Sequence, residues 1–166
     1  MSIWLKVPLI LLALLSPVIP VVLMSDYFTG EGGPEDLGVS WEETPILRWE
    51  VMRGLDLKTS VASGDLVEVL KGPIKVPGYI VPLEVGDKQV SEFLLVPTQG
   101  ACVHVPPPPA NQMLFVRLKK GGVPAQEKRA PVWVQGRAQL SNSETKWGEV
   151  SFLLDGVDVR PYEGGY

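Results

Sequence analysis

The chain has 166 residues, enough for one domain and hardly for two, and its hydrophobic content of 45% is that of a globular protein. Its 17 glycines and 16 prolines favour short strands and turns, and its single cysteine excludes an internal disulfide framework. The net charge is −4, with seven acids and one base between residues 25 and 50. This is not the basic footprint of a nucleic-acid binder, so we expect no nucleic acid among the partners.

The amino end contains an uncharged apolar run, residues 7–24, directly after Lys6. Eighteen residues are at the lower limit for crossing a bilayer. Because the base precedes the run and the acids follow it, the positive-inside tendency predicts an inner-membrane anchor with the body facing the periplasm. The alternative is a cleaved signal peptide within residues 1–24, whose apolar core ends at Pro17 or Pro20 and whose removal releases the body into the periplasm.

A linker and the start of the folded domain come next. Residues 25–40 are rich in glycine and acids and lack an apolar period, which predicts a flexible acidic linker. Residues 41–166 are expected to form a single domain of unknown function. Within it, residues 41–54 predict a helix with Pro45 in its first turn. Asp65 with Glu68 predicts one further short helical turn that stops at Gly72.

The rest of the domain has the composition of strands separated by turns. Strand-like runs occupy residues 74–84, 90–97, 113–118, 132–140 and 149–159, and the first two are joined by a hairpin signal. A long excursion lies between the second and third runs. This spacing favours a mainly β fold, a small five-stranded closed or half-closed barrel. Large aromatic side chains dominate protein cores, so the core is expected to include Trp41, Trp49, Trp133 and Trp147.

The most unusual segment is residues 93–116, FLLVPTQGACVHVPPPPANQMLFV. It contains the only cysteine, Cys102, and the only histidine, His104, just before four consecutive prolines. On an extended chain, residues two apart point to the same side, with β-carbons roughly 6.5–7 Å apart. That span suits two ligands of one metal ion better than a direct thiol–imidazole contact.

Three interpretations of this segment stay open. In the first, Cys102 is a buried apolar residue and His104 fastens the loop. In the second, both bind a metal such as zinc or another small ligand; two protein ligands are too few for a closed zinc site, so a carboxylate such as Glu84 or a partner chain is needed. In the third, Cys102 is a nucleophile and His104 its base, in a thiol-dependent envelope enzyme. Asn111 and Gln112 bring amides back toward the barrel and are candidate ligand-binding residues.

Three motifs also resemble a known family. The segments GYIVPLE (residues 78–84), FLLVPTQGACVHVPPPPANQ (93–112) and PVWVQG (131–136) are similar, in this order, to the bacterial envelope family called domain of unknown function 3299. The resemblance implies an exported domain with an oligonucleotide/oligosaccharide-binding-like (OB-like) barrel. It also implies a companion of export-type or metal-homeostasis ABC transporters, some linked to zinc, and no established catalytic activity. Unlike many relatives, this chain has no lipobox and no aromatic residue near Thr98.

The sequence therefore predicts an exported, membrane-tethered accessory or binding domain rather than an enzyme. Its expected partners are the inner membrane and subunits of an ABC transporter, and zinc is the expected cofactor if there is one. The thiol-dependent enzyme and a purely structural interaction domain are the alternatives.

Overall fold

The computed structural model describes residues 37–83, 89–99, 107–124, 130–146 and 148–163. The chain divides into two units, Met1–Glu31 and Gly32–Tyr166, and every described residue belongs to the second. The predicted anchor (residues 1–24) and the linker up to residue 36 lie outside the described residues. Within the described ranges, no helix combines the length and the apolar composition needed to cross a membrane.

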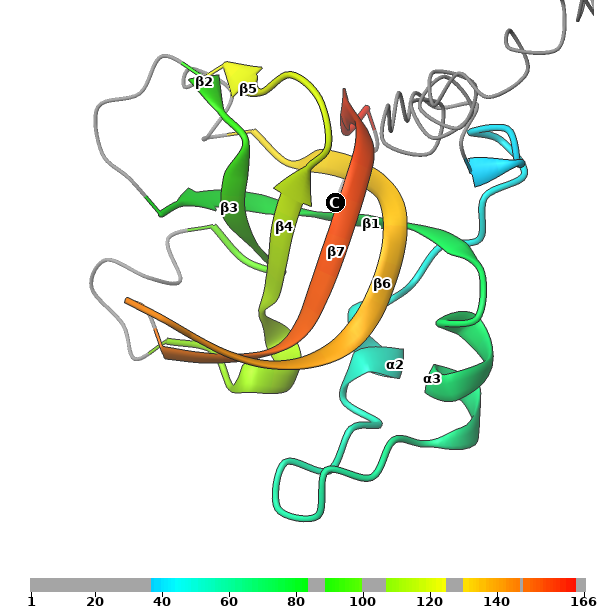
Figure 1. Ribbon diagram of the computed structural model, residues 1–166, viewed down its shortest axis with the longest axis vertical. Coiled ribbons are helices and arrows are strands. Elements are labelled where there is room, and N and C mark those ends of the chain that lie inside the picture. Colours follow the sequence, from blue (N-terminus) through cyan, green and yellow to red (C-terminus); the bar gives the residue numbers. More distant parts are fainter. Residues whose placement is uncertain (1–36, 84–88, 100–106, 125–129, 147, 164–166) are drawn as a thin grey trace, which may run out of the picture. The chain divides into compact units, whose positions relative to one another are not determined.

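The fold is mainly β, with one sheet of five strands (Figure 1). The strands are β1 (Pro73–Pro82), β3 (Glu92–Val96), β4 (Leu114–Leu118), β6 (Val132–Thr145) and β7 (Gly148–Pro161). They pair in the order β1-β3-β4-β7-β6, and β6 pairs with β1 again, so the sheet closes on itself. The β4–β7 pair is parallel, and the other pairs are antiparallel. All five strand-like runs of the sequence are therefore strands.

Two short strands pair apart from this sheet. They are β2 (Gln89–Val90) and β5 (Val123–Pro124), joined in antiparallel register. The predicted strand 90–97 is thus divided, because Val90 pairs with Val123 whereas Glu92–Val96 pair with β1 and β4. The predicted hairpin between the first two runs is confirmed by the antiparallel pairing of β1 with β3.

The predicted helix 41–54 is mostly wrong, since only α2 (Trp49–Met52) is helical. Residues 45–47 are instead extended beside β1: the amide of Leu47 donates to the Lys75 carbonyl, and the amide of Lys75 donates to the Pro45 carbonyl. Bonding to a neighbouring strand overrides the local helical pattern here. The second predicted helix is present as α3 (Gly64–Val69), although its N-cap is Ser63, whose hydroxyl accepts from the Leu66 amide.

The core lies between the strands and the segment before β1. Alternate residues of β1 are buried, as expected for a strand with one face inward. Residues of α2 and α3 belong to the same core as the strands. The largest fully buried members of this core are Phe93, Phe152, Leu47, Met52, Leu66, Ile74, Leu95, Leu114 and Leu154. A second, smaller cluster covers the opposite face of β3 and contains Leu94, Val96, Met113 and Val150.

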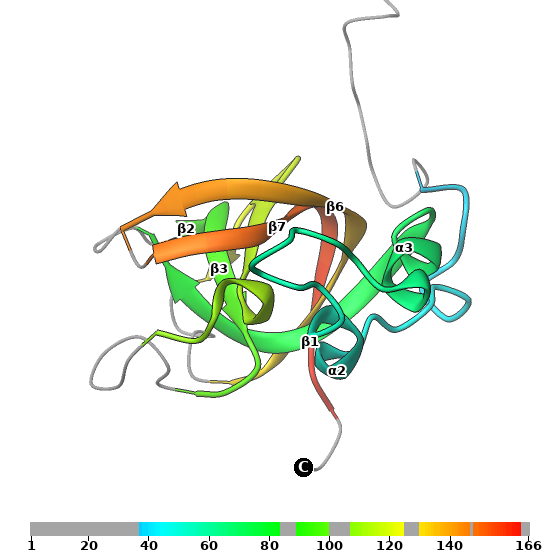
Figure 2. The same cartoon turned by 90° about the horizontal axis from the view of Figure 1, so that it is seen from below.

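Beyond the closed sheet, β6 and β7 continue as a two-stranded arm (Figures 1 and 2). Pairing of β1 with β6 stops at Arg137, and pairing of β4 with β7 starts at Phe152, while β6 and β7 stay paired up to Thr145 and Gly148. The sequence placed the end of this strand at residue 140. The strand in fact continues to Thr145. Residues 141–145 are polar and show no apolar alternation, so only the neighbouring strand β7 holds them in the sheet. The arm contains a register shift between Leu140 and Ser143.

Candidate functional site

The predicted site residues divide into two groups. Cys102, His104 and Glu84 lie outside the described residues, so their predicted roles are not tested. Asn111 and Gln112 lie in the short 3₁₀ helix η3 (Ala110–Gln112), directly after Pro107–Pro109. Pro109 has φ of −60° and ψ of 153°, the extended geometry expected at the end of a proline run.

Gln112 clamps η3 to α2. Its side chain exposes 5% of its surface, and its Nε2 donates to the Trp49 carbonyl at 3.1 Å and to the Asn111 carbonyl at 2.8 Å. Its Oε1 accepts from Arg53 Nε at 3.3 Å. The amide therefore adds a second donor to the Trp49 carbonyl, which also accepts from the Arg53 backbone amide at 3.2 Å.

Asn111 makes a second link of the same kind. Its Nδ2 donates to the Leu55 carbonyl at 2.9 Å, just past the end of α2. Both amides thus join the end of the proline run to the segment before β1, with donors already in use. This placement gives them a structural role; their predicted ligand-binding role stays a prediction.

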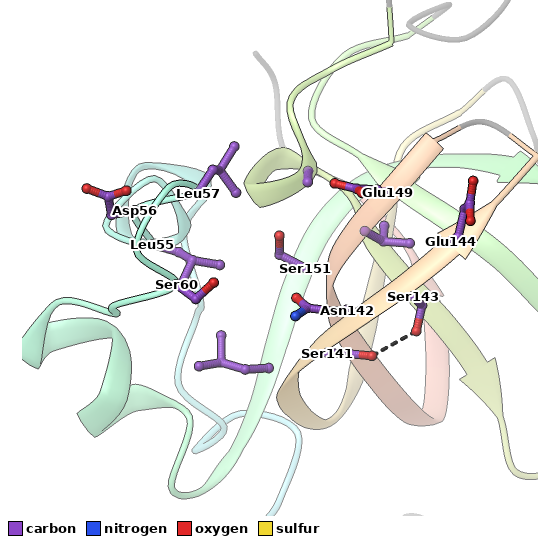
Figure 3. Close-up of a pocket in the computed structure, with 13 residues that line it drawn as sticks. Leu55, Asp56, Leu57, Ser60, Ser141, Asn142, Ser143, Glu144, Glu149 and Ser151 are labelled. Carbon is purple, nitrogen blue, oxygen red and sulfur yellow. Dashed lines mark hydrogen bonds between the residues drawn. The ribbon is translucent and has the colours of Figure 1, made fainter.

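A groove of about 540 Å³ lies next to this clamp (Figure 3). One wall is the loop after α2, the other is the β6–β7 arm, and Ala110 of η3 borders it. Its residues are Leu55, Asp56, Leu57, Ser60, Ala110, Leu140, Ser141, Asn142, Ser143, Glu144, Glu149, Val150 and Ser151. Figure 3 shows the loop and the arm facing one another, with Ser151 and Asn142 between them.

The groove contains a buried hydroxyl and three acids. Ser151 exposes 6% of its surface, and no described residue forms a hydrogen bond with its hydroxyl. Glu144 and Glu149 are directly opposite one another on β6 and β7 and are both exposed. Like charges at directly opposed positions destabilise a β ladder. The arm therefore carries an unfavourable local arrangement at the place where the groove is most polar.

Asp56 places the third negative charge on the facing wall. Its Oδ1 accepts from the backbone amides of Thr59 at 3.1 Å and Lys58 at 2.7 Å, which shapes the loop. These bonds, with that of Thr59 the larger influence, hold the pKa of the Asp56 carboxyl below its ordinary value of 3.8. Asp56 is therefore ionised at neutral pH.

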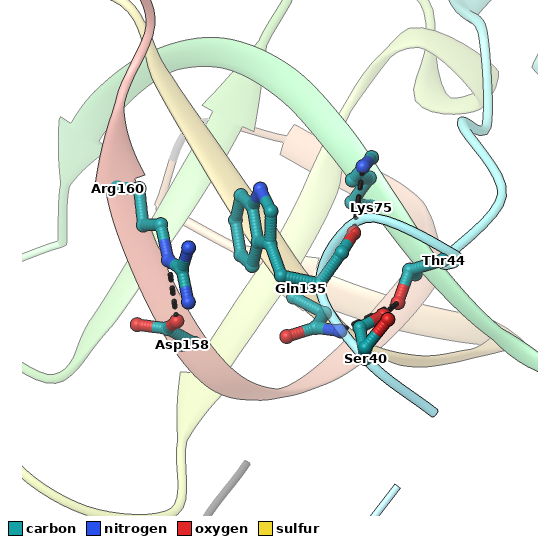
Figure 4. A network of polar contacts seen from close by, with 7 residues as sticks. Ser40, Thr44, Lys75, Gln135, Asp158 and Arg160 are labelled. Atoms are coloured by element: carbon teal, nitrogen blue, oxygen red, sulfur yellow. Dashed lines mark hydrogen bonds and ion pairs between the residues drawn. The ribbon is translucent and has the colours of Figure 1, made fainter. Parts of the chain in front are cut away.

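A separate polar network surrounds Trp41 (Figure 4). The Arg160 guanidinium lies 4.2 Å from the centre of the Trp41 ring, and Lys75 Nζ lies 5.5 Å from it and donates to the Trp41 carbonyl. Nearby, the buried Gln135 donates to the Thr44 hydroxyl at 2.6 Å. These contacts attach the segment before α2 to β1, β6 and β7.

The tryptophan expectation is confirmed for Trp49, which is buried and donates from Nε1 to the Pro77 carbonyl at 2.7 Å. It is wrong for Trp41 and Trp133, which are half-buried. Trp41 lies against cationic side chains, and Trp133 packs on Tyr162, so each finds partners on the surface of the sheet. Trp147 lies outside the described residues.

Within the described ranges, no group of three or more histidine, cysteine or acidic side chains is arranged to hold a metal ion. The sequence pattern did not point to Glu144, Glu149, Ser151 or Asp56 as candidate site residues. The available signal was the position of Glu144 and Glu149 around a turn, which opposes them in a hairpin. The predicted strand 132–140 stops before Glu144, so the sequence pattern did not place Glu144 opposite Glu149.

Comparisons with known proteins agree on the family. The family model described as protein of unknown function (DUF3299) matches residues 49–161. A crystal structure of a DUF3299 family protein from Pseudomonas aeruginosa PAO1 is similar, with 31% sequence identity and a TM-score of 0.58, over 74% of this chain and 99% of that chain. A protein assigned as an aspartyl-tRNA synthetase from Leishmania major Friedlin aligns with 7% identity and a TM-score of 0.37, over 90% of this chain and 27% of that chain, which supports no argument. No curated protein matches. The resemblance to this family is confirmed, and the chain belongs to the DUF3299 family.

Proposed function

We infer that this chain is an accessory domain of the cell envelope, tethered to the inner membrane, that binds a partner through an OB-like barrel and is not an enzyme. The observation that carries this inference is the groove beside the β6–β7 arm. One of its walls is the hairpin between the fourth and fifth strands of the closed sheet. OB barrels bind their ligands with their strand 2–3 face and with the loops after strands 1 and 4.

The strand order supports the OB-like assignment. Numbered within the closed sheet alone, the strands pair in the order 1-2-3-5-4 and return to 1, with the third and fifth parallel. This is the Greek-key arrangement of an OB barrel. The acids of the groove argue against an oligonucleotide, whose phosphates they would repel, and favour a neutral or cationic partner.

The expected location is tested by the orientation of the body. The order of Lys6, the apolar run and the acidic linker supports export of residues 41–166 to the periplasm. A β-lactamase fusion at the carboxyl end should confer ampicillin resistance, and mass spectrometry should find the original amino terminus. A mature amino terminus near Ser25 would show that residues 1–24 are a cleaved signal peptide and not an anchor. A fusion that confers no resistance would place residues 41–166 in the cytoplasm and refute the envelope role.

Zinc is the cofactor that this function favours, with Cys102 and His104 as its ligands and Glu84 or a residue of a transporter subunit completing the site. Bound there, zinc would join the proline segment to its partner. Metal analysis of the purified full chain should find about one equivalent of zinc, which Cys102→Ala and His104→Ala each remove. Rapid alkylation of Cys102 near neutral pH that His104→Ala slows would instead indicate the thiol-dependent enzyme.

A further inference from the structure

One edge of the arm has no backbone partner among the described residues. In the stretch 138–144 of β6, residues 138–140, 143 and 144 pair with β7, and residues 141 and 142 lie at the register shift. On the other side, no described residue forms a backbone hydrogen bond with this stretch. A free strand edge presents unpaired N–H and C=O groups that can accept another extended chain. At about 3.3 Å per residue, this edge spans about 20 Å, the length of a peptide of about seven residues.

The groove extends along this edge. Five consecutive residues of β6, numbers 140–144, line it, so it follows the strand for most of the unpaired length. The register shift between Leu140 and Ser143 places Ser141 and Asn142 opposite the single residue Ser151. The buried Ser151 hydroxyl, without a described partner, therefore lies beside the position that a guest side chain would reach.

The negative charge of the groove favours a positively charged ligand. Asp56, Glu144 and Glu149 line it, and the described lining contains no lysine or arginine. Leu57 and Leu140 are large apolar side chains that expose 47% and 46% of their surface there. A lysine or arginine side chain fits both features, since its aliphatic stem covers apolar surface while its charge meets carboxylates.

Other occupants fit less well. A second copy paired at the same edge would bring two more glutamates beside Glu144 and Glu149, and like charges across a ladder are destabilising. Residues 25–36 of the chain itself contain four acids and no base. Nucleic acid and anionic lipid carry the same sign of charge as the groove.

The geometry points to the groove as a docking site for an extended, basic peptide segment of a partner protein, which adds a strand to the free edge of β6. Backbone hydrogen bonds supply affinity, and alternate side chains of the guest enter the groove. A guest guanidinium or ammonium group neutralises the Glu144–Glu149 pair and donates to Ser151. This inference rests on the proposed binding function and names the class of partner.

The test uses the full chain in a nonionic detergent and a fluorescein-labelled octapeptide of alternating arginine and threonine. Such a peptide, once extended, places all its arginines on one face. Anisotropy titrations should detect saturable binding that the double variant Glu144→Gln/Glu149→Gln weakens about tenfold. The matched double variant Glu42→Gln/Glu50→Gln removes two exposed acids outside the groove and should bind like the parent.

A fully N-methylated form of the same peptide keeps its charges and loses its backbone donors, so it should not bind. If the methylated peptide bound with the same affinity as the unmodified peptide, the interaction would depend on charge alone, and the proposed strand pairing would be wrong. Equal weakening by both double variants, or no binding to the parent, would overturn the site. A dimer seen by sedimentation that the groove variant alone dissociates would assign the edge to a second copy. A cytoplasmic location would refute the proposed envelope function without changing any of these binding results.

Discussion

The strands β6 and β7 belong both to the closed sheet and to the arm, yet the residues in these two regions follow opposite patterns. In the closed part, strand residues alternate between a filled interior and the outside, and Phe152 and Leu154 of β7 are fully buried. In the arm, polar residues predominate, Glu144 opposes Glu149, and one edge has no described partner. Local rules of stability are commonly broken at functional sites. The comparison indicates that the closed sheet supplies the stability and that the arm is available for binding.

The largest effect on stability is expected from removing a large buried side chain from the core of the closed sheet. Phe152→Ala removes a fully buried ring and should lower the free energy of unfolding by about 3–5 kcal/mol, a large part of the total for a small domain. Urea denaturation followed by tryptophan fluorescence measures it. The control is Leu57→Ala on the groove wall, where the side chain is half exposed and the change should stay within about 0.5 kcal/mol. Equal costs at the two positions would remove the distinction between the regions.

The next effect tests where β6 leaves the closed sheet. A Cβ on Gly136 would overlap the backbone oxygen of Asp155 on β7, so Gly136→Ala should cost about 3 kcal/mol or more. Gly64, the first residue of α3, has open space around its would-be Cβ, and Gly64→Ala should be neutral or stabilising by up to about 1 kcal/mol. Thermal unfolding of both variants provides the comparison. A tolerated Gly136→Ala would show that β6 and β7 can separate at the register shift between Gln135 and Gly136.

A smaller effect is expected at the clamp beside the groove. Gln112→Ala removes the hydrogen bonds from the buried side-chain amide to the Trp49 and Asn111 carbonyls and should lower the free energy of unfolding by about 1–3 kcal/mol. The control Asn142→Ala changes an exposed amide of the arm and should alter stability by less than about 0.5 kcal/mol. If Gln112→Ala left stability unchanged but prevented ligand binding, the predicted ligand role of Gln112 would replace the structural one.

The smallest effect has the opposite sign. Glu144→Gln removes the repulsion from Glu149 and should raise the free energy of unfolding by about 0.2–1 kcal/mol, more at low salt than at high salt. Glu50→Gln, which alters an exposed glutamate of α2, is the matched control and should show no gain. A loss of stability in Glu144→Gln would mean that this carboxylate has a favourable partner in the folded chain, and the contrast between the regions would weaken.

The sequence predicted the closed part of the fold well because burial enforces a two-residue period. The run 74–84 shows this period, since buried and half-buried residues alternate along β1. The helix predicted for residues 41–54 was mostly wrong, because a contact with a distant segment outweighs the local pattern. Their apolar spacing fits a helix, but Pro45 and Leu47 form backbone hydrogen bonds with Lys75, almost 30 residues away, and a local pattern cannot express that pairing.

The candidate site shows the same division. The proline run and the amides that follow it were visible as a motif, and the structure gives Asn111 and Gln112 partners on α2 and just beyond it. The groove could not be predicted, because its walls come mainly from residues 55–60 and 140–151. No feature of either segment indicates that it lies beside the other. Only pairing of β6 with β7 sets Glu144 against Glu149.

By itself, the sequence determined the family, the mainly β class and the residue types that fill the core, because composition and short-range periodicity record burial directly. The tertiary structure alone decided which strands close the sheet, which edge stays unpaired and which acids share a groove. Those features depend on contacts between distant segments, whose free energy appears only once the chain has folded.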